Sequence, residues 1–384
     1  MVEESRLREG YKTTDLGIIP SDWEVVEVKE AYGIYNNLRL PISGKIRETI
    51  QGKYPYYGPT GIQDYINEYR LDGEYSLIGE DGDHFLKWRN MPMTLLVTGK
   101  FNVNNHAHVI KGLKNHTEWF YWYFYHRDIT AHLSRQGAGR YKLNKRTLET
   151  LKMAIPSLLE QKAISNVLSD TNNLIQSLEN LIDKKKKIKQ GAMKQLLTGK
   201  KRLPGFSAEW EVKKLGEVAD IRTGKRNNQD KVSDGLYPFF VRSQDVERIN
   251  TYSYDGEAVL VPGEGGIGNI FHYINGKFEV HQRVYKISDF LNVSGKYVYY
   301  YMKQSFGAHA MKNTVKATVD SLRLPTFQEF ELKIPNNFEE QKAIVQVLSD
   351  MDAEIKALEE KLEKVKTVKQ GMMQELLTGR IRLI

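Results

Sequence analysis

Two stretches of the chain carry apolar side chains at alternating steps of four and three residues. In the second stretch these positions are Ile344, Leu348, Met351, Ile355, Leu358, Leu362, Val365, Met372 and Leu376, with Lys369 in the one gap. The first stretch equivalently places Ile164, Leu168, Thr171, Ile175, Leu178, Ile182, Ala192 and Leu196, with Lys185 and Lys189 as polar interruptions. A period of 3.5 residues sustained over about four heptads predicts two long helices that form a coiled coil.

The two stretches are near-copies of one sequence. Aligned from Glu160 and Glu340, an offset of 180 residues, they are identical at 24 of 44 positions. An Ile-Pro pair precedes each copy, which predicts an extended entry just before the helix. Gly199 and Gly379 each follow a Leu-Leu-Thr phrase and are the predicted helix stops.

The simplest partner for one long helix is the other. At 1.5 Å per residue, about 40 residues make a helix of roughly 60 Å. A parallel pair would require the domain between the helices to carry the chain back over that length, whereas an antiparallel pair needs no such detour. The phrase Trp23–Val25 recurs at Trp210–Val212, after the first helical copy. We therefore expect a pseudo-two-fold dumbbell, in which the N-terminal segment takes over where the C-terminal copy stops.

The remaining sequence predicts two mixed α/β domains, so the predicted fold class is α+β. Runs such as EYSLIG and EAVLVP predict strands, and the aromatic runs WFYWYFYH and KYVYYYM predict core helices. Paired phrases such as DGEYSLIGEDG and DGEAVLVPGEGG indicate that the domains share a plan and have diverged. The predicted divisions are a first domain at 1–155, a central helix at 156–203, a second domain at 204–335 and a C-terminal helix at 336–384.

Composition narrows the class of protein. The 384 residues carry a net charge of +8, and residues 156–203 hold 10 Lys and Arg against 4 Asp and Glu, which favours a polyanionic partner. The chain has no cysteine and no long apolar run, and its N-terminus is too charged for a signal peptide, so we expect a cytoplasmic protein without a membrane span. It contains no phosphate-binding GxxxxGK[ST] motif and no Asn-Pro-Pro-aromatic tetrapeptide.

Across essentially its whole length the chain resembles the specificity subunits of type I restriction–modification systems. The resemblance is carried by EEQKAI…VLSD…KQGMMQELLTG and by YPYYG, GEGGIGN, NNHAH and HQRVY. It implies two target recognition domains, each reading one half of a bipartite double-stranded DNA target. It also implies helices that space the halves and dock two adenine-methylating modification subunits, with restriction subunits added to that core. No cofactor is then expected in this chain, and S-adenosylmethionine, ATP and magnesium belong to the partner subunits.

Candidate DNA-contacting residues stand in the loops of both domains. In the first domain they are Lys45, Arg47, Lys53, Asn104, Asn105, His106, Arg135, Arg140 and Lys142. In the second they are Lys225, Arg226, Arg242, Gln244, His281, Gln282, Arg283, Lys312 and Lys316. Basic loop residues suit phosphates, whereas Asn and Gln suit adenine and Arg suits guanine. For the basic loop residues the alternative is a solvated surface without DNA contact. For the run Lys184–Lys187 a solvated helix face is the preferred interpretation, and contact with the DNA backbone or an acidic partner is the second.

Three histidines allow several roles. His106 and His108 alternate on a predicted strand and so share a face, and His281 stands at the matching place in the second domain. Structural hydrogen bonding, DNA contact and metal ligation are the alternatives. A metal site would need a third ligand nearby, and cysteine is absent.

Other motifs have plain alternatives. GEGGIG at Gly263–Gly268 matches a dinucleotide fingerprint, but the sequence after it predicts a strand where that fingerprint needs a helix, so we expect a tight loop. Asp81, Asp83 and Lys87 match a nuclease cluster only loosely. Two roles are open to the aromatic residues Tyr56, Tyr57, Phe239 and Phe240. Core packing is preferred, and stacking on a displaced base is the alternative.

The leading hypothesis is a non-catalytic DNA specificity subunit. A stand-alone nuclease or methyltransferase is the second class, and the motifs for either are missing from the sequence. A structural coiled-coil adaptor is the third, but it would not need two differentiated domains. A specificity subunit of a methylation-only complex is a further alternative that sequence does not separate from the first.

Overall fold

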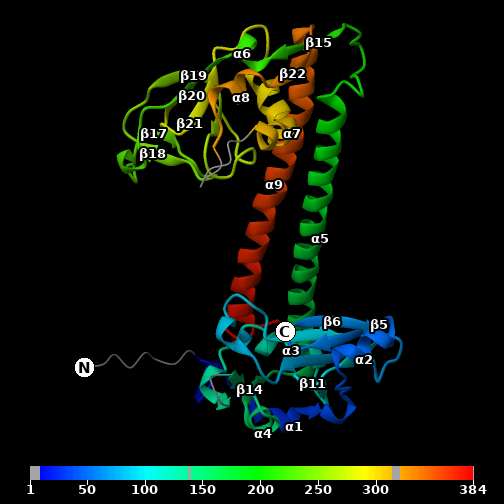
Figure 1. Ribbon diagram of the computed structural model, residues 1–384. Coiled ribbons are helices and arrows are strands. Elements are labelled where there is room, and N and C mark those ends of the chain that lie inside the picture. Colours follow the sequence, from blue (N-terminus) through cyan, green and yellow to red (C-terminus); the bar gives the residue numbers. More distant parts are fainter. Residues whose placement is uncertain (1–8, 137–139, 314–320, 384) are drawn as a thin grey trace, which may run out of the picture. The chain divides into compact units, whose positions relative to one another are not determined.

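The structure is a computed structural model that describes residues 9–136, 140–313 and 321–383 (Figure 1). The chain divides into two units. The first comprises Met1–Leu178 with Lys361–Ile384, and the second comprises Glu179–Glu360. Each unit therefore holds one mixed α/β domain and a half of each long helix.

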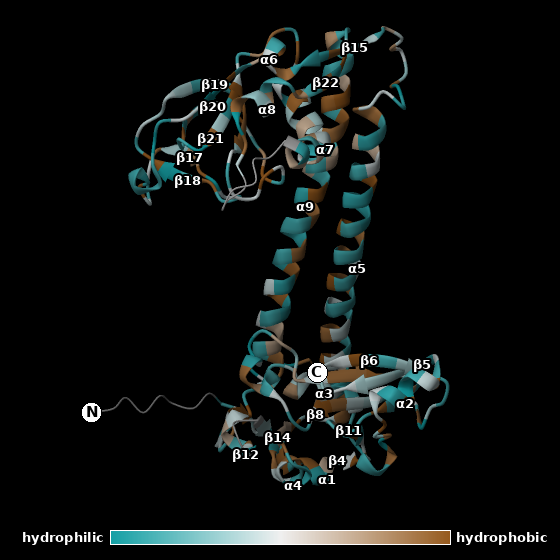
Figure 2. Ribbon diagram, in the orientation of Figure 1, coloured by the Kyte–Doolittle hydropathy of each residue, from teal (hydrophilic) through white to brown (hydrophobic). Residues whose placement is uncertain are grey.

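The two long helices are α5 (Leu158–Leu196) and α9 (Phe338–Leu376), each of 39 residues. Their predicted heptad positions are buried or half-buried, as in Ile344 and Leu348 on α9. Figure 2 shows hydrophilic residues along much of the rest of both helices. Gly199 and Gly379 have φ of 69° and 71°, the left-handed conformation in which helices commonly end. The predicted long helices and their stops are confirmed.

The helices pair in antiparallel fashion, as predicted. In the first unit, Lys369 Nζ donates to Asn172 Oδ1 at 2.7 Å. In the second unit, Lys185 Nζ lies 2.6 Å from Glu354 Oε1. Later residues of α5 thus meet earlier residues of α9. The run Lys184–Lys187, predicted as a solvated face, also joins the helices, since Lys186 pairs with Glu359 at 2.7 Å.

The domain of the first unit contains two four-stranded sheets, ordered β6-β5-β10-β7 and β4-β11-β8-β9. All pairings within them are antiparallel except that of β10 with β5. The strands are β1 (Tyr11–Thr14), β2 (Gly17–Pro20), β3 (Glu24–Glu27), β4 (Tyr32–Ile34), β5 (Gln51–Gly58), β6 (Gly61–Ile66), β7 (Leu71–Asp72), β8 (Tyr75–Gly79), β9 (Thr94–Val97), β10 (Lys100–Val103), β11 (Ala107–Gly112), β12 (Ser134–Gln136), β13 (Arg140–Lys142) and β14 (Lys152–Ile155). The helices are α1 (Val28–Ala31), α2 (Gly44–Thr49), α3 (Thr117–Phe124) and α4 (Lys145–Thr150), with 3₁₀ turns η1 (Asn36–Leu38), η2 (Asp83–Lys87) and η3 (Thr130–His132).

The aromatic helix α3 forms the centre of the first unit's core. All eight of its side chains are buried. Its six aromatic side chains share one apolar cluster with Ile164 and Leu168 of α5 and Leu376 of α9. The domain therefore packs onto both long helices through the predicted core helix.

The domain of the second unit is built on a six-stranded sheet, ordered β16-β21-β19-β20-β17-β18. Its one parallel pairing joins β17 to β20, as β5 joins β10 in the first unit. The strands are β15 (Trp210–Lys214), β16 (Asp220–Thr223), β17 (Tyr237–Phe240), β18 (Glu247–Ile249), β19 (Tyr254–Pro262), β20 (His272–Val280), β21 (Val284–Ser288) and β22 (Glu331–Pro335). The helices are α6 (Leu215–Val218), α7 (Gly295–Asn313) and α8 (Leu324–Gln328), with the 3₁₀ turn η4 (Asn228–Asp230).

A two-stranded sheet joins domain to helix in the same way in both units. In the first unit β3 pairs with β14, which leads into α5. In the second unit β15 pairs with β22, which leads into α9. The matching phrases at Trp23–Val25 and Trp210–Val212 begin these equivalent strands, so the shared plan predicted for the two domains is confirmed.

Candidate nucleic-acid interface

Three segments of the first unit converge beside the turn at residues 104–106. The amide of Glu80, after β8, donates to the carbonyl of His106 at 2.7 Å. The amide of Leu143, after β13, donates to the carbonyl of Glu80 at 2.8 Å. The segments after β8, β10 and β13 therefore form one continuous loop cluster.

Glu80 holds the basic side chains of this cluster. Its carboxylate lies 2.6 Å from Arg39 Nη1 and 3.4 Å from Lys142 Nζ. Burial raises the pKa of Glu80, but the Arg39 hydrogen bond and the neighbouring charges outweigh burial, so the pKa lies below its usual value. An ionised Glu80 fixes both cations, and each keeps donors for a further acceptor.

The residues of the turn itself are divided between interior and surface. Asn104 is buried, with Nδ2 donating to Gln63 Oε1 and Oδ1 accepting from the His106 amide. Asn105 and His106 are exposed, and His106 Nδ1 lies 2.8 Å from Asp81 Oδ2. Of the three predicted residues, only Asn105 and His106 present side chains to solvent.

The prediction that His106 and His108 share a face is wrong. His106 lies in the turn before β11, whereas His108 lies within β11 and is fully buried. His108 Nε2 donates to the carbonyl of Leu143 at 2.7 Å, and Nδ1 accepts from Asn36 Nδ2 at 2.8 Å. Burial lowers the pKa of His108. For His108 the structural alternative therefore holds.

The other first-unit candidates lie elsewhere in the domain. Lys45 and Arg47 are on α2, and Arg47 pairs with Asp64 at 2.9 Å. Lys53 lies over the Tyr54 ring on β5. In the β12–β13 hairpin Arg135 Nη2 donates to Tyr141 Oη at 2.6 Å, and Arg140 begins β13. Among the candidates of this unit, Asn105, His106 and Lys142 belong to the Glu80 cluster.

A second loop cluster forms in the other unit around the turn at residues 281–283. The Gln282 amide donates to the carbonyl of Arg226 at 2.8 Å. The Gly263 amide donates to the carbonyl of Arg283 at 2.9 Å. The segments after β16, β19 and β20 therefore meet. The last two correspond to the segments after β8 and β10 of the first unit.

Glu264 holds the basic side chains of this cluster. It occupies the place of Asp81, because the Gly263 amide donates to Arg283 as the Glu80 amide donates to His106. Its carboxylate lies 2.6 Å from Arg283 Nη1 and 3.4 Å from Arg242 Nη1. The arginine side chains are 55% and 51% exposed, against 21% for Glu264. One face of each guanidinium is thus anchored while its other donors remain available to a ligand.

The remaining second-unit candidates differ in exposure. His281 is buried, and its Nδ1 accepts from the Arg283 amide at 3.0 Å. Arg226 Nε lies 3.5 Å from Glu279. The other described candidates are exposed, and they are Lys225, Gln244, Gln282 and Lys312. Lys316 lies outside the described residues.

The two glutamates, and Arg39, were missed by sequence reasoning. Glu80 follows β8 in the phrase GED, and Glu264 follows β19 in the phrase GEG, one position further along the paired phrases. An acidic residue in the loop after each of these equivalent strands was the available signal.

The other candidate chemistry resolves into structural roles. The segment Gly263–Gly268 is a loop with positive φ at three glycines, followed by strand β20, so the predicted tight loop is confirmed. Asp81 pairs with His106, while Asp83 and Lys87 are exposed in η2. Among the described residues, no group of three or more His, Asp or Glu side chains is placed to hold a metal ion.

Core packing, the preferred alternative for the aromatic candidates, holds for three of the four. Tyr56 is buried with its hydroxyl donating to the Leu40 carbonyl at 2.7 Å, and Phe239 and Phe240 are buried. Tyr57 is half-buried and packs edge-on against Phe101.

Two segments of the chain match the family model described as the type I restriction modification DNA specificity domain, at residues 20–190 and 207–367. The chain belongs to this family. Each match runs through one mixed α/β domain into a long helix, which is the repeat predicted from the sequence. The resemblance to type I restriction–modification specificity subunits is therefore confirmed.

Relatives match over nearly the whole chain. The type I restriction enzyme MjaVIII specificity subunit of Methanocaldococcus jannaschii is 25% identical, covering 95% of this chain and 94% of its own. A Haemophilus influenzae protein named as a type I restriction enzyme specificity subunit is 28% identical, with 86% and 87% covered. The crystal structure of the specificity subunit from M. genitalium has the same fold, with a TM-score of 0.70, 15% identity and coverage of 92% and 96%. Among the described helices of this family member, none is long and apolar enough to cross a membrane.

Proposed function

We propose that this specificity subunit is non-catalytic and binds double-stranded DNA, with each domain reading one half of an asymmetric bipartite target. The observation that carries the proposal is the pair of loop clusters around Glu80 and Glu264. Each cluster places basic side chains on a carboxylate in the loop that follows an equivalent strand, Glu80 after β8 and Glu264 after β19. Shared scaffolding with unlike exposed residues is what reading two unlike half-sites requires.

The exposed residues of each cluster suit a different half-site. The first presents the exposed Asn105 and His106 and the half-buried Lys142, and the second presents the exposed Gln282 and Arg283. Arg pairs with guanine through two hydrogen bonds, Asn or Gln pairs with adenine, and Lys suits phosphate or guanine. The described geometry leaves those side-chain donors at the surface, where a base edge or phosphate can reach them.

The helices supply spacing and docking. Two 39-residue helices related by a near-copied sequence offer equivalent surfaces for two modification subunits. Restriction subunits would join that core. S-adenosylmethionine, ATP and magnesium would then be bound by those partners, which supply the methylation and cleavage.

Adenine-methylation mapping tests this function. DNA is compared from cells expressing the chain with its modification subunit and from cells lacking the chain. We expect a new bipartite motif with a fixed non-specific spacer and one methylated adenine per strand, in opposite halves. Exchange of one domain should change one half only.

Absence of chain-dependent methylation, with the modification subunit active through another specificity subunit, would overturn the proposal in favour of the adaptor. Methylation without cleavage would indicate a methylation-only complex.

A further inference from the structure

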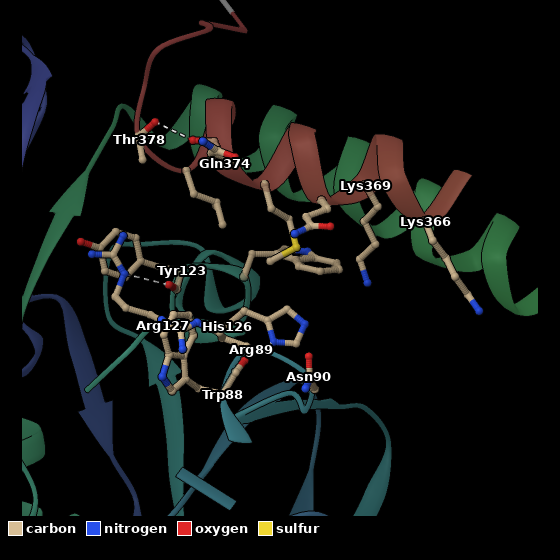
Figure 3. A pocket seen from close by; sticks show the side chains of 14 residues that line it. Trp88, Arg89, Asn90, Tyr123, His126, Arg127, Lys366, Lys369, Gln374 and Thr378 are labelled. Carbon is tan, nitrogen blue, oxygen red and sulfur yellow. Dashed lines mark hydrogen bonds between the residues drawn. The ribbon is translucent and has the colours of Figure 1, made fainter. Parts of the chain in front are cut away.

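A cavity of about 860 Å³ lies within the first unit, away from the Glu80 cluster. Its walls come from the segment after η2, the end of α3 and the last turns of α9 (Figure 3). In Figure 3 Lys369 extends from α9 toward the wall that carries His126. A cavity of this volume is of the size that small-molecule ligands occupy.

The described lining of the cavity is cationic. It includes Arg89, Arg127, Lys366 and Lys369, and no Asp or Glu among the described residues lines it. Outside the lining, Glu363 pairs with Lys366 at 3.5 Å on the same helix. The net charge of the wall is therefore strongly positive.

The cations lie over aromatic rings. Arg89 stacks 4.5 Å from the Trp88 centroid, and Arg127 lies 3.7 Å from that of Tyr123. A guanidinium stacked on a ring keeps the N–H donors at its edge, because stacking uses only its face. The aromatic faces are already covered, so a ligand entering the cavity meets donors of hydrogen bonds before it meets rings.

Lys369 stands out when the two helical copies are compared. Its equivalent in the first copy, Lys189, is buried and forms an ion pair with Asp352. The residue equivalent to Asp352 is Asn172, and Lys369 Nζ donates to Asn172 Oδ1. No ion pair among the described residues includes Lys369, so it has a neutral amide where Lys189 has a carboxylate.

The surroundings of Lys369 make this missing counter-ion costly. Its ammonium lies 4.7 Å from the centroid of the Tyr125 ring. His126 and Lys366 are further titratable groups that line the same cavity. On the side of α5, Lys369 meets the uncharged Asn172. Burial lowers the pKa of Lys369 to about 8. His126 Nδ1 donates to the Trp88 carbonyl at 2.6 Å, and burial lowers its pKa as well. A bound anion would raise both values.

We propose that this cavity binds a phosphate-bearing ligand, whose anion serves Lys369 as the counter-ion that Asp352 gives Lys189. Two guanidinium groups and two ammonium groups around one cavity match a multiply charged anion better than a single carboxylate. The phosphate has two possible sources, a free nucleotide or polyphosphate and the backbone of bound DNA. The proposal is independent of target reading, because the cavity contains none of the candidate DNA-reading residues.

Calorimetric titration of the purified full chain with tripolyphosphate and with ATP tests the proposal. Asn172→Asp gives Lys369 an internal carboxylate of nearly the same shape and should weaken binding about tenfold or more, since a charge-assisted contact is lost. The surface variant Arg89→Gln should weaken it similarly without disturbing the core. Lys364→Met, at an exposed position of α9, is the matched control and should bind as the wild type does. Binding should be tighter at pH 7 than at pH 9.5, because Lys369 is protonated at the lower pH.

A second titration with duplex DNA present distinguishes the sources. Unchanged tripolyphosphate binding at saturating DNA supports a free ligand. Competition, together with weaker DNA binding by Asn172→Asp, supports a backbone phosphate. The proposal is overturned if tripolyphosphate and ATP fail to bind and DNA affinity is unchanged in both variants, or if Lys364→Met weakens binding as much as they do. Methylation mapping reports separately on target recognition, so failure of either proposal is visible without the other.

Discussion

Arg382 forms a two-pronged ion pair with Glu160, at 2.7 and 2.9 Å, although 222 positions separate them. Arg202 forms the same pair with Glu340, at 2.5 and 2.7 Å. Both arginines follow a helical copy by the same number of residues, and both glutamates begin the other copy. The C-terminal copy thus closes onto the N-terminal segment of its unit, where Arg382 also pairs with Asp22 at 2.7 Å. The Arg382–Glu160 pair in the first unit is therefore equivalent to the Arg202–Glu340 pair in the second, where the chain runs on from Arg202 into the domain.

Arg382→Ala should destabilise the first unit by about 2–3 kcal/mol. The Glu160 side chain is 2% exposed, so loss of the guanidinium leaves a buried carboxylate with only the Trp23 indole as a donor at 3.1 Å. The partial exposure of Arg382 keeps the cost below that of a fully buried pair. Urea unfolding monitored by tryptophan fluorescence measures the loss.

Arg380→Ala is the control, because Arg380 is exposed and pairs with Glu375 on the surface. We expect it to change stability by less than about 0.5 kcal/mol. Equal destabilisation by both variants would show that the closing pair contributes nothing beyond a surface contact.

Stability should rise between pH 8 and pH 10 through Lys369. The pKa of Lys369 is about 8 in the folded chain against an ordinary 10.5, so the unfolded chain binds more protons in this window. The burial of the charged ammonium therefore costs stability below pH 8, and the cost is relieved as pH rises. Allowing for solvent screening, the gain is about 1–2 kcal/mol. Urea midpoints at pH 7 and pH 9.5 measure it.

Lys369→Met should remove that rise, since no ammonium remains to deprotonate. Lys364→Met, exposed on the same helix, should keep it. Comparison of the wild type, Lys369→Met and Lys364→Met removes the contribution of the tyrosines and the remaining lysines to the pH dependence of stability, because all three proteins contain those residues. A rise of the same size in Lys369→Met would contradict the assignment.

The helices were predictable because a period of 3.5 residues and a near-exact repeat are local signals. The closing pair of Arg382 with Glu160 was only implied, by the place where the repeat stops. The strand predicted to hold both His106 and His108 holds only His108, because Asn104 forms a turn before it, its Oδ1 accepting from the His106 amide at 2.8 Å. The Asn-Asn-His phrase carried that signal, since asparagine favours such turns.

The carboxylates that hold the candidate site could not be found by charge counting. In the sequence, Glu80 and Glu264 lower the net positive charge of the loops that contain them. In the fold, Glu80 pairs with Arg39 and Lys142. Glu264 pairs with Arg242 and Arg283. Their partners come from separate loops, so only the assembled sheet brings them together.

Glu264→Gln should reduce discrimination at the second half of the target by about tenfold, while the first half is unaffected. The change frees Arg242 and Arg283 from the carboxylate that orients them, and an oriented Arg–base contact contributes about 1–3 kcal/mol of discrimination. Non-specific DNA affinity should be unchanged or higher, because a negative charge is removed. Methylation mapping, with binding to targets altered in one half, measures both effects.

Glu247→Gln is the matched control in the same domain, since Glu247 pairs with Lys231 at 3.0 Å outside the Glu264 cluster. It should leave both halves unchanged. Loss of discrimination in the first half by Glu264→Gln would contradict the assignment of one half to each domain.

Insertion of one heptad into each long helix should lengthen the target's spacer. Seven residues add about 10.5 Å to an α-helix, and a whole heptad preserves the apolar register of both helices. At about 3.4 Å per base pair, the spacer should grow by about three base pairs while both half-sites keep their sequences. The insertions belong between Leu178 and Glu179 and between Glu360 and Lys361, where the two units divide. Methylation mapping gives the new spacer.

A three-residue insertion at each point is the control, because it breaks the heptad register and should abolish methylation. An unchanged spacer in an active heptad variant would show that something other than helix length sets the separation.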